Sequence, residues 1–103
     1  MPKGYVILTE AIRDGEGMAA YSRASAPSLA EQRATVLAVD ARPDVLEGSW
    51  HGDRTVVMEF ESVAAARAWY ESEAYQKALP LRQAAADCNV VILEGFVMPP
   101  SRA

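Results

Sequence analysis

Residue types that build metal and redox sites are scarce in this chain: the sequence has one cysteine, Cys88, and one histidine, His51. A single cysteine excludes an internal disulfide and is typical of the reducing cytoplasm, where we expect the protein. Zinc sites need several such ligands, so these two distant residues predict no metal site. We expect His51 in an exposed loop, and Cys88 as a packed or surface residue rather than a nucleophile.

Clustered positive charge is missing as well. The ten lysine and arginine side chains are scattered and the net charge is −4, so the sequence predicts no nucleic-acid partner. No apolar run is long enough to cross a bilayer, and the first residues lead directly into a strand pattern, so we expect no signal sequence and no membrane partner. Glycine-rich phosphate loops and the Gly-x-Ser-x-Gly elbow are absent too, which disfavours nucleotide-dependent chemistry and serine hydrolysis. We therefore expect no cofactor.

The chain does contain enough apolar sequence for one core, since half of its 103 residues are hydrophobic. We predict a single domain over residues 1–97 and a loose C-terminal tail over residues 98–103. Short β-branched and aromatic runs predict strands, and Pro43 indicates that the second of them is an edge strand or contains a bulge. The predicted strands cover residues 5–10, 35–40 with a continuation at 45–48, 54–60 and 89–96.

Helical spacing of apolar residues separates these strands. Pro27 is expected to interrupt the first helix because proline lacks an amide hydrogen, and Ser28 has the spacing of a capping box at which the helix could restart. Pro80 is expected to bend the last helix. The predicted helices cover residues 16–32, 62–70 and 72–86, with Asp14, Ser62 and Ser72 as their N-caps.

The order β-α-β-β-α-β is that of an α+β, ferredoxin-like fold, in which a four-stranded antiparallel sheet carries its helices on one face. Both alternating residue sets of the strands are apolar, for example Tyr5 and Ile7 against Val6 and Leu8. A sheet that is apolar on both faces needs a second layer, and no element of this chain is left to supply it. We therefore predict a homodimer formed sheet against sheet, a dimeric α/β barrel.

Two carboxylates, Glu47 and Glu59, stand within the predicted strands of the central hairpin. On adjacent strands they could lie near each other or near a shared cation, and a half-buried carboxylate is suited to act as a general base. Arg82 shares a predicted helix face with Tyr75 and could bind a substrate carboxylate through two hydrogen bonds. The alternative is structural: each glutamate pairs with Arg54 or Arg82 and ties the sheet to the helix.

Several aromatic side chains with a polar group are candidates for substrate binding. Tyr21, Tyr70, Tyr75 and Trp69 either line a pocket with their hydroxyl and indole groups or are core residues whose polar ends are satisfied. Trp50 stands in the predicted hairpin loop, where it could cover a cleft or the dimer edge.

The sequence resembles a known family on a set of short motifs. Glu-Phe-x-Ser at residues 59–62 is followed by Tyr-x-Ser-x-x-Tyr-Gln at residues 70–76 and by Arg82, and further matching pieces include Gly4-Tyr5 and Glu94-Gly95. Together these motifs resemble the domain of unknown function family 1330 of the dimeric α/β barrel superfamily. The resemblance implies a dimeric ferredoxin-like fold and a small-molecule site, without fixing a reaction. Relatives in that superfamily include cofactor-free monooxygenases, muconolactone isomerases and haem-dependent proteins.

Three hypotheses about function follow from these observations. In the first, the protein is a cofactor-free isomerase, cyclase or monooxygenase-like enzyme for a small aromatic or carboxylated metabolite, with Glu59 or Glu47 as base and Arg82 as anion holder. In the second, it is a dimeric small-molecule binding or accessory protein with the same pocket and no turnover. In the third, these polar residues are structural only and the site lies elsewhere.

Overall fold

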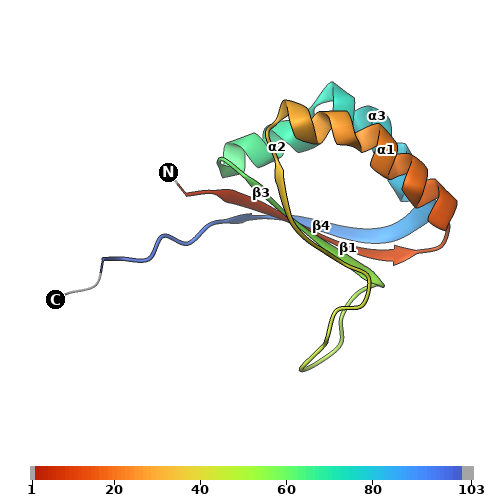
Figure 1. Cartoon of the computed structure of the whole chain (residues 1–103), viewed down its shortest axis with the longest axis horizontal. Helices are drawn as coiled ribbons and strands as arrows, with labels where there is room; N and C mark the ends of the chain where they lie inside the picture. The colour runs from red at the N-terminus through yellow and green to blue at the C-terminus, as the bar shows by residue number, and fades with distance from the viewer. Residues whose placement is uncertain (1, 101–103) are drawn as a thin grey trace.

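The computed structural model describes residues 2–100 and has the predicted β-α-β-β-α-β order. Its four strands form one antiparallel sheet in the order β2-β3-β1-β4, and all three helices lie on one face of that sheet (Figure 1). The ferredoxin-like fold is therefore confirmed, and the second helical region consists of two helices, as predicted. The elements are β1 (Gly4–Ile12), α1 (Gly15–Glu31), β2 (Thr35–Asp40), β3 (Arg54–Phe60), α2 (Val63–Glu71), α3 (Glu73–Ala85) and β4 (Ala86–Glu94).

Alternation along β1 separates a helix-covered face from an open face of the sheet. Val6, Leu8 and Glu10 are buried under the helices, whereas Tyr5 and the other odd-numbered residues of the strand are half-buried on the open face. The core on the covered side is aromatic, and its tightest ring pair is Trp69 with Tyr75, whose centroids are 4.1 Å apart.. None of the helices within residues 2–100 has the length and apolar character needed to span a membrane.

The three predicted N-caps are confirmed, because Asp14, Ser62 and Ser72 each accept a hydrogen bond from a free backbone amide of the helix that follows. The predicted interruption at Pro27 is wrong: α1 continues through it to Glu31, and α3 likewise continues through Pro80. Both prolines lie on exposed helix faces, where water can bind the backbone carbonyl that loses its partner.

The predicted continuation of the second strand at residues 45–48 is also wrong. β2 ends at Asp40, and residues 41–53 form a long loop without regular structure that projects beyond the sheet (Figure 1). Within this loop Gly48 and Gly52 adopt left-handed φ angles of 76° and 82°, which glycine tolerates without steric cost. β2 is the edge strand, as expected from Pro43.

The last strand differs from its prediction at both ends. β4 begins at Ala86, immediately after α3, and stops at Glu94. Residues 95–100 extend away from the sheet without regular structure (Figure 1), and residues 101–103 of the predicted tail lie outside the described residues.

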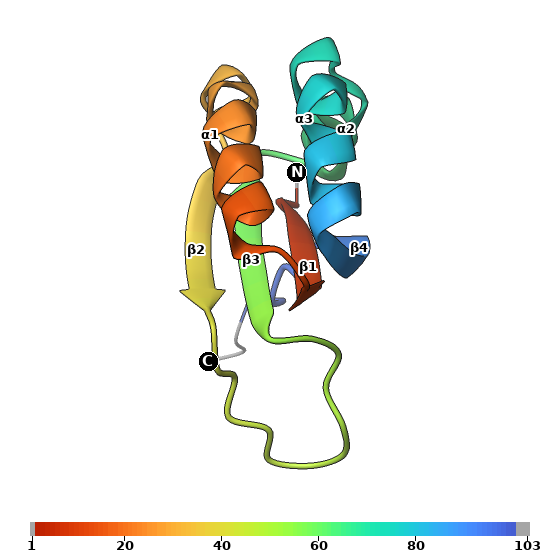
Figure 2. The ribbon, with the colours of Figure 1, turned by 90° about the vertical axis from the view of Figure 1, so that its right-hand side faces the viewer.

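The helices cover the sheet unevenly. α2 and α3 lie over the side of β1 and β4, whereas α1 lies over the side of β2 and β3 (Figure 2). On this second side the covered face is incompletely filled, because Val36 and Val39 of β2 point toward the helices and still keep 48% and 57% of their surface exposed. Space is therefore left between α1 and the edge of the sheet.

Candidate functional site

The space between α1 and the sheet is a cavity of about 180 Å³. Its walls are mostly apolar, and its polar members are one carboxylate, one guanidinium, one phenol and two hydroxymethyl groups. A mostly apolar hollow with a few convergent polar groups is the usual form of a small-molecule site. The residues that line it are Leu8, Glu10, Tyr21, Ser22, Ser25, Ala26, Leu29, Val36, Val39, Arg54, Val56, Met58 and Trp69.

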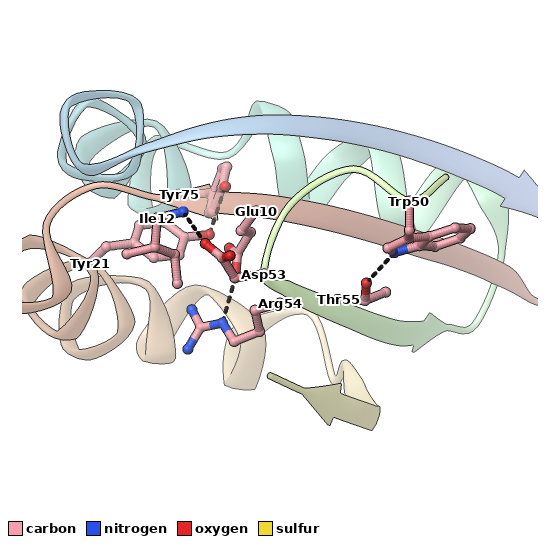
Figure 3. A network of polar contacts seen from close by, with 8 residues as sticks. All are labelled: Glu10, Ile12, Tyr21, Trp50, Asp53, Arg54, Thr55 and Tyr75. Carbon is pink, nitrogen blue, oxygen red and sulfur yellow. Dashed lines mark hydrogen bonds and ion pairs between the residues drawn. The ribbon is translucent and has the colours of Figure 1, made fainter. Parts of the chain in front are cut away.

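Glu10 and Arg54 form an ion pair at this cavity. They are directly opposite each other on β1 and β3, on the helix-covered face, and Arg54 Nε donates a hydrogen bond of 2.6 Å to Glu10 Oε1 (Figure 3). Glu10 is 1% exposed, whereas the Arg54 side chain is 24% exposed. A carboxylate buried this deeply needs a partner, and Arg54 supplies it from the more accessible side.

A second polar group is formed by Tyr21, which lines the cavity, and by Tyr75 and Arg82, which lie behind it. The two tyrosine hydroxyl oxygens are 2.8 Å apart, and Arg82 Nε donates to the Tyr75 hydroxyl at 3.2 Å (Figure 3 shows the tyrosine pair). The guanidinium carbon of Arg82 lies 5.8 Å from the centre of the Tyr21 ring. Burial, reinforced by the neighbouring Tyr75, raises the pKa of Tyr21 well above its ordinary value, so its hydroxyl stays protonated.

Arg82 is 4% exposed, and burial by itself would lower its pKa. Hydrogen bonding to Cys88 and Tyr75 outweighs burial and raises the pKa of Arg82. The guanidinium is therefore a permanent positive charge behind the tyrosines. No ion pair of Arg82 with a carboxylate is present among residues 2–100.

The three predicted catalytic residues are not brought together. Glu59 lies on the open face, where it accepts a hydrogen bond of 3.0 Å from the Tyr5 hydroxyl, and this bond raises the pKa of Tyr5. Arg82 lies on the opposite, helix-covered side of the sheet. Glu47 is exposed in the loop of residues 41–53, so its expected place on a strand beside Glu59 is wrong.

The structural alternative for these glutamates is wrong as well, because neither pairs with Arg54 or Arg82 in the part of the chain that the structure describes. Arg54 is engaged by Glu10 instead. Glu10 was missed by the sequence reasoning, although its signal was present. It follows Val6 and Leu8 at the strand period of two, so the alternation that predicts those core residues also places Glu10 inside.

The predicted aromatic residues are divided between two sides of the sheet. Tyr21 and Trp69 line the cavity, and Tyr75 is buried directly behind Tyr21. Tyr70 is half-buried at a separate hollow that Arg82 also lines. Trp50 is 52% exposed in the long loop, where its indole nitrogen donates to Thr55 Oγ1 at 2.8 Å (Figure 3).

His51 is half-buried rather than exposed as predicted. Its Nδ1 lies 2.7 Å from Thr9 Oγ1, and its Nε2 lies 3.5 Å from Asp87 Oδ2. Both contacts are on the open face, at a second hollow that Trp50 and Asn89 also line. Within residues 2–100 no group of three or more histidine, cysteine or acidic side chains could hold a metal ion.

Comparison with known proteins identifies a family and a set of similar folds. The sequence model of the family described as Domain of unknown function (DUF1330) matches residues 3–96. No curated protein matches the chain.

Three solved structures illustrate the similar folds. A protein of unknown function from Rhodopseudomonas palustris is 24% identical, with a TM-score of 0.78 and coverage of 94% of this chain and 85% of that one. A dimeric ferredoxin-like protein of unknown function from Jannaschia sp. CCS1 is 19% identical, with a TM-score of 0.68 and coverage of 89% and 98%. SnoaB, a cofactor-independent oxygenase from Streptomyces nogalater, is 12% identical, with a TM-score of 0.66 and coverage of 98% and 100%. At these identities the likeness shows the fold alone.

Proposed function

The chain belongs to the family Domain of unknown function (DUF1330), and we propose that it is a cofactor-independent enzyme that transfers a proton on a small metabolite. The observation that carries this proposal is the carboxylate of Glu10, which is 1% exposed and lines a mostly apolar cavity. Proton transfer needs a positioned base shielded from bulk water, and Glu10 meets both conditions. Isomerisation, cyclisation and reaction with oxygen can all begin with such a step.

Glu10 and Arg54 have separate tasks in this proposal. Glu10 accepts a proton from an acidic C–H group of the substrate and returns it to another position. Arg54 holds the carboxylate in place through the hydrogen bond from its Nε. The proposal assigns the base to Glu10 rather than Glu59 because Glu59 is bound to Tyr5 on the opposite face of the sheet.

We also propose that the protein works as a homodimer joined through the open faces of two sheets. The open face keeps apolar residues in contact with water, among them Val91 at 48% and Leu93 at 50% exposure. The structural neighbour from Jannaschia is described as a dimeric ferredoxin-like protein, which supports this arrangement. The cavity lies on the other side of the sheet, so each protomer would keep its own site.

The proton-transfer proposal can be tested before the substrate is known. Small cyclic and aryl ketones are dissolved in D₂O, and loss of the proton NMR signals beside the carbonyl is followed with and without protein. We expect the wild type to accelerate exchange for part of this panel, and Glu10→Gln to lose about 100-fold or more of that acceleration. Glu59→Gln is the matched control and keeps the wild-type rate. Equal exchange in wild type and Glu10→Gln would remove Glu10 as the base.

A non-catalytic binding or accessory function is the second candidate, and one observation favours it. The hydrogen bond between Arg54 and Glu10 is short, at 2.6 Å, so the carboxylate already has a partner that a base must partly release. To test this candidate, small molecules that co-purify with the protein are identified by mass spectrometry and then incubated with it. If the protein only binds them, their masses are the same before and after incubation.

A further inference from the structure

We infer that Tyr21 donates a hydrogen bond into the cavity, at the end of a chain that starts at Arg82 and passes through Tyr75. The substrate that fits this donor is a single-ring compound with a carbonyl group. This inference rests on the proposed function, because it assigns the group that would stabilise the anion formed when Glu10 removes a proton.

The direction of the chain follows from what each group is able to donate. Arg82 has no acceptor atom, so its Nε must donate to the Tyr75 hydroxyl oxygen, which lies 3.2 Å away. Tyr75 is 0% exposed, and its own O–H therefore needs an acceptor within the protein. The only acceptor bonded to it in residues 2–100 is the hydroxyl oxygen of Tyr21, at 2.8 Å.

Tyr21 is then left with a hydrogen to donate. Its oxygen accepts from Tyr75, and the hydrogen bonds of residues 2–100 include no other partner for this hydroxyl. Tyr21 lines the cavity, whereas Tyr75 and Arg82 do not. The free O–H therefore belongs to the member of the chain that a molecule bound in this cavity can reach.

The positive charge of Arg82 strengthens this donor. Hydrogen bonds in a chain polarise one another, and a chain that begins at a cation makes the terminal O–H more positive. The raised pKa of Tyr21 means that the hydroxyl keeps its proton and donates it as a hydrogen bond rather than releasing it. Such a donor stabilises negative charge that develops on an oxygen atom, as in an oxyanion hole.

The chemical step is balanced without any further reactant. The C–H bond beside the carbonyl breaks, its proton goes to Glu10, and the electron pair moves onto the carbonyl oxygen, which accepts the Tyr21 hydrogen bond. When the substrate also carries a C=C bond conjugated with this enolate, the electron pair returns from oxygen to re-form the C=O bond. The proton then goes from Glu10 to the far carbon of the conjugated system, which completes an isomerisation and regenerates Glu10. The size of the ligand follows from the cavity: it measures about 180 Å³, and an apolar cavity of about 150 Å³ accommodates one benzene ring.

The test uses acetophenone labelled with carbon-13 at the carbonyl, bound to the full chain. The C=O stretching frequency of the bound probe is measured by infrared difference spectroscopy, with hexane solution as the reference without hydrogen bonds. We expect the wild type to lower this frequency relative to hexane, and Tyr21→Phe to return it to the hexane value while the affinity falls about tenfold or less.

Two further variants separate the chain from a general effect of mutation. Tyr75→Phe keeps the Tyr21 hydroxyl and cuts its link to Arg82, so the frequency should fall between the wild-type and Tyr21→Phe values. Tyr5→Phe removes a phenol hydroxyl on the open face and should give the wild-type frequency. The inference is overturned if wild type and Tyr21→Phe give the same frequency, or if acetophenone does not bind the wild type.

The Tyr21 hydrogen bond and proton transfer to Glu10 can fail separately, and the two experiments distinguish these outcomes. If the frequency shift is present but Glu10→Gln does not slow deuterium exchange, proton transfer to Glu10 is wrong and Tyr21 remains a ligand-binding group. If exchange depends on Glu10 but Tyr21→Phe changes neither the exchange rate nor the C=O frequency, the proton-transfer function is supported and the role assigned to Tyr21 is wrong.

Discussion

At the scale of single residues, the unequal burial of Glu10 and Arg54 has a direct consequence for stability. Glu10 is 1% exposed, whereas Arg54 keeps 24% of its side chain in contact with solvent. When the pair is broken, Arg54 can turn toward water but Glu10 cannot. The two partners are therefore not equivalent, although the same hydrogen bond joins them.

We expect Arg54→Ala to lower the free energy of unfolding by about 3 kcal/mol, because it leaves a buried carboxylate without a counter-ion. Glu10→Gln should cost less, about 1 kcal/mol, because the amide oxygen still accepts from Arg54. Urea unfolding followed by circular dichroism measures both. Lys77→Ala, which breaks an exposed pair with Glu73, is the control and should change little. A larger loss for Glu10→Gln than for Arg54→Ala would contradict this account.

Tyr21 makes stability depend on alkaline pH. Its folded-state pKa lies above the ordinary value of 10.0, so above pH 10 the unfolded chain releases a proton that the folded chain keeps. Deprotonation then favours the unfolded state, and the contribution of Tyr21 is present below pH 10 and falls as pH rises.

We therefore expect the stability advantage of wild type over Tyr21→Phe to shrink between about pH 9 and pH 11. Urea midpoints of both proteins over this range provide the measurement. A difference that stays constant with pH would show that the Tyr21 hydroxyl is not protected from ionisation.

The residue scale also shows what sequence reasoning could reach. The buried positions of β1 follow from a period of two, and the same period contains Glu10. Glu47 and Glu59 were predicted to be candidate bases because they stand among apolar residues in the sequence. However, sequence neighbours do not determine which face of a sheet a side chain joins. The partner of Glu59 is Tyr5, 54 positions away, and no local pattern indicates that contact.

At the scale of elements, helices and caps were predictable and the loop was not. The polar caps Asp14, Ser62 and Ser72 act within three residues, so their signal is local. The apolar residues at 45–48 resemble a strand, but they lie in the irregular loop of residues 41–53, in which Gly48 and Gly52 adopt left-handed φ angles. Whether a proline breaks a helix depends on which face it occupies, which the tertiary structure decides.

Replacement of Pro27 in α1 tests whether a proline on an exposed helix face costs only its missing hydrogen bond. Pro27 lies inside a continuous helix on an exposed face, so its cost is a missing backbone hydrogen bond rather than a clash with the core. We expect Pro27→Ala to raise the free energy of unfolding by about 1 kcal/mol or more, measured by urea unfolding. Pro80→Ala, in the same situation on α3, should behave alike. A loss of stability in either variant would show that the proline ring makes contacts that the helix needs.

At the scale of the whole molecule, the covered and open faces of the sheet have different tasks. The covered face holds the core and the cavity, while the open face leaves Val91 and Leu93 about half exposed. A contiguous apolar surface on a sheet favours association with a second layer. The apolar character of the open face could be predicted from the sequence because both alternating sets of the strands are apolar.

We expect Val91→Asp to convert the proposed dimer into monomers, because it places an unpaired charge at the centre of the joined sheets. Light scattering coupled to size-exclusion chromatography measures the mass. Leu81→Asp is the matched control: Leu81 is 40% exposed on α3, on the helix side, and its replacement should leave the dimer intact. A wild-type chain that elutes as a monomer at micromolar concentration would contradict the arrangement.

The loop of residues 41–53 is anchored where it joins β3 and is exposed at its tip, and this division matters for protein engineering. At the anchored end, Asp53 is hydrogen-bonded to the backbone of Glu10 and Ile12. Gly52 is packed so closely on Glu10 that an added Cβ would lie 2.5 Å from the carbonyl carbon of Glu10. At the tip, Leu46 is 87% exposed and Gly48 has open space around it. A peptide tag or fluorescent label inserted between residues 46 and 48 would therefore extend into solvent, whereas one inserted beside Gly52 would displace the strand that carries the candidate base.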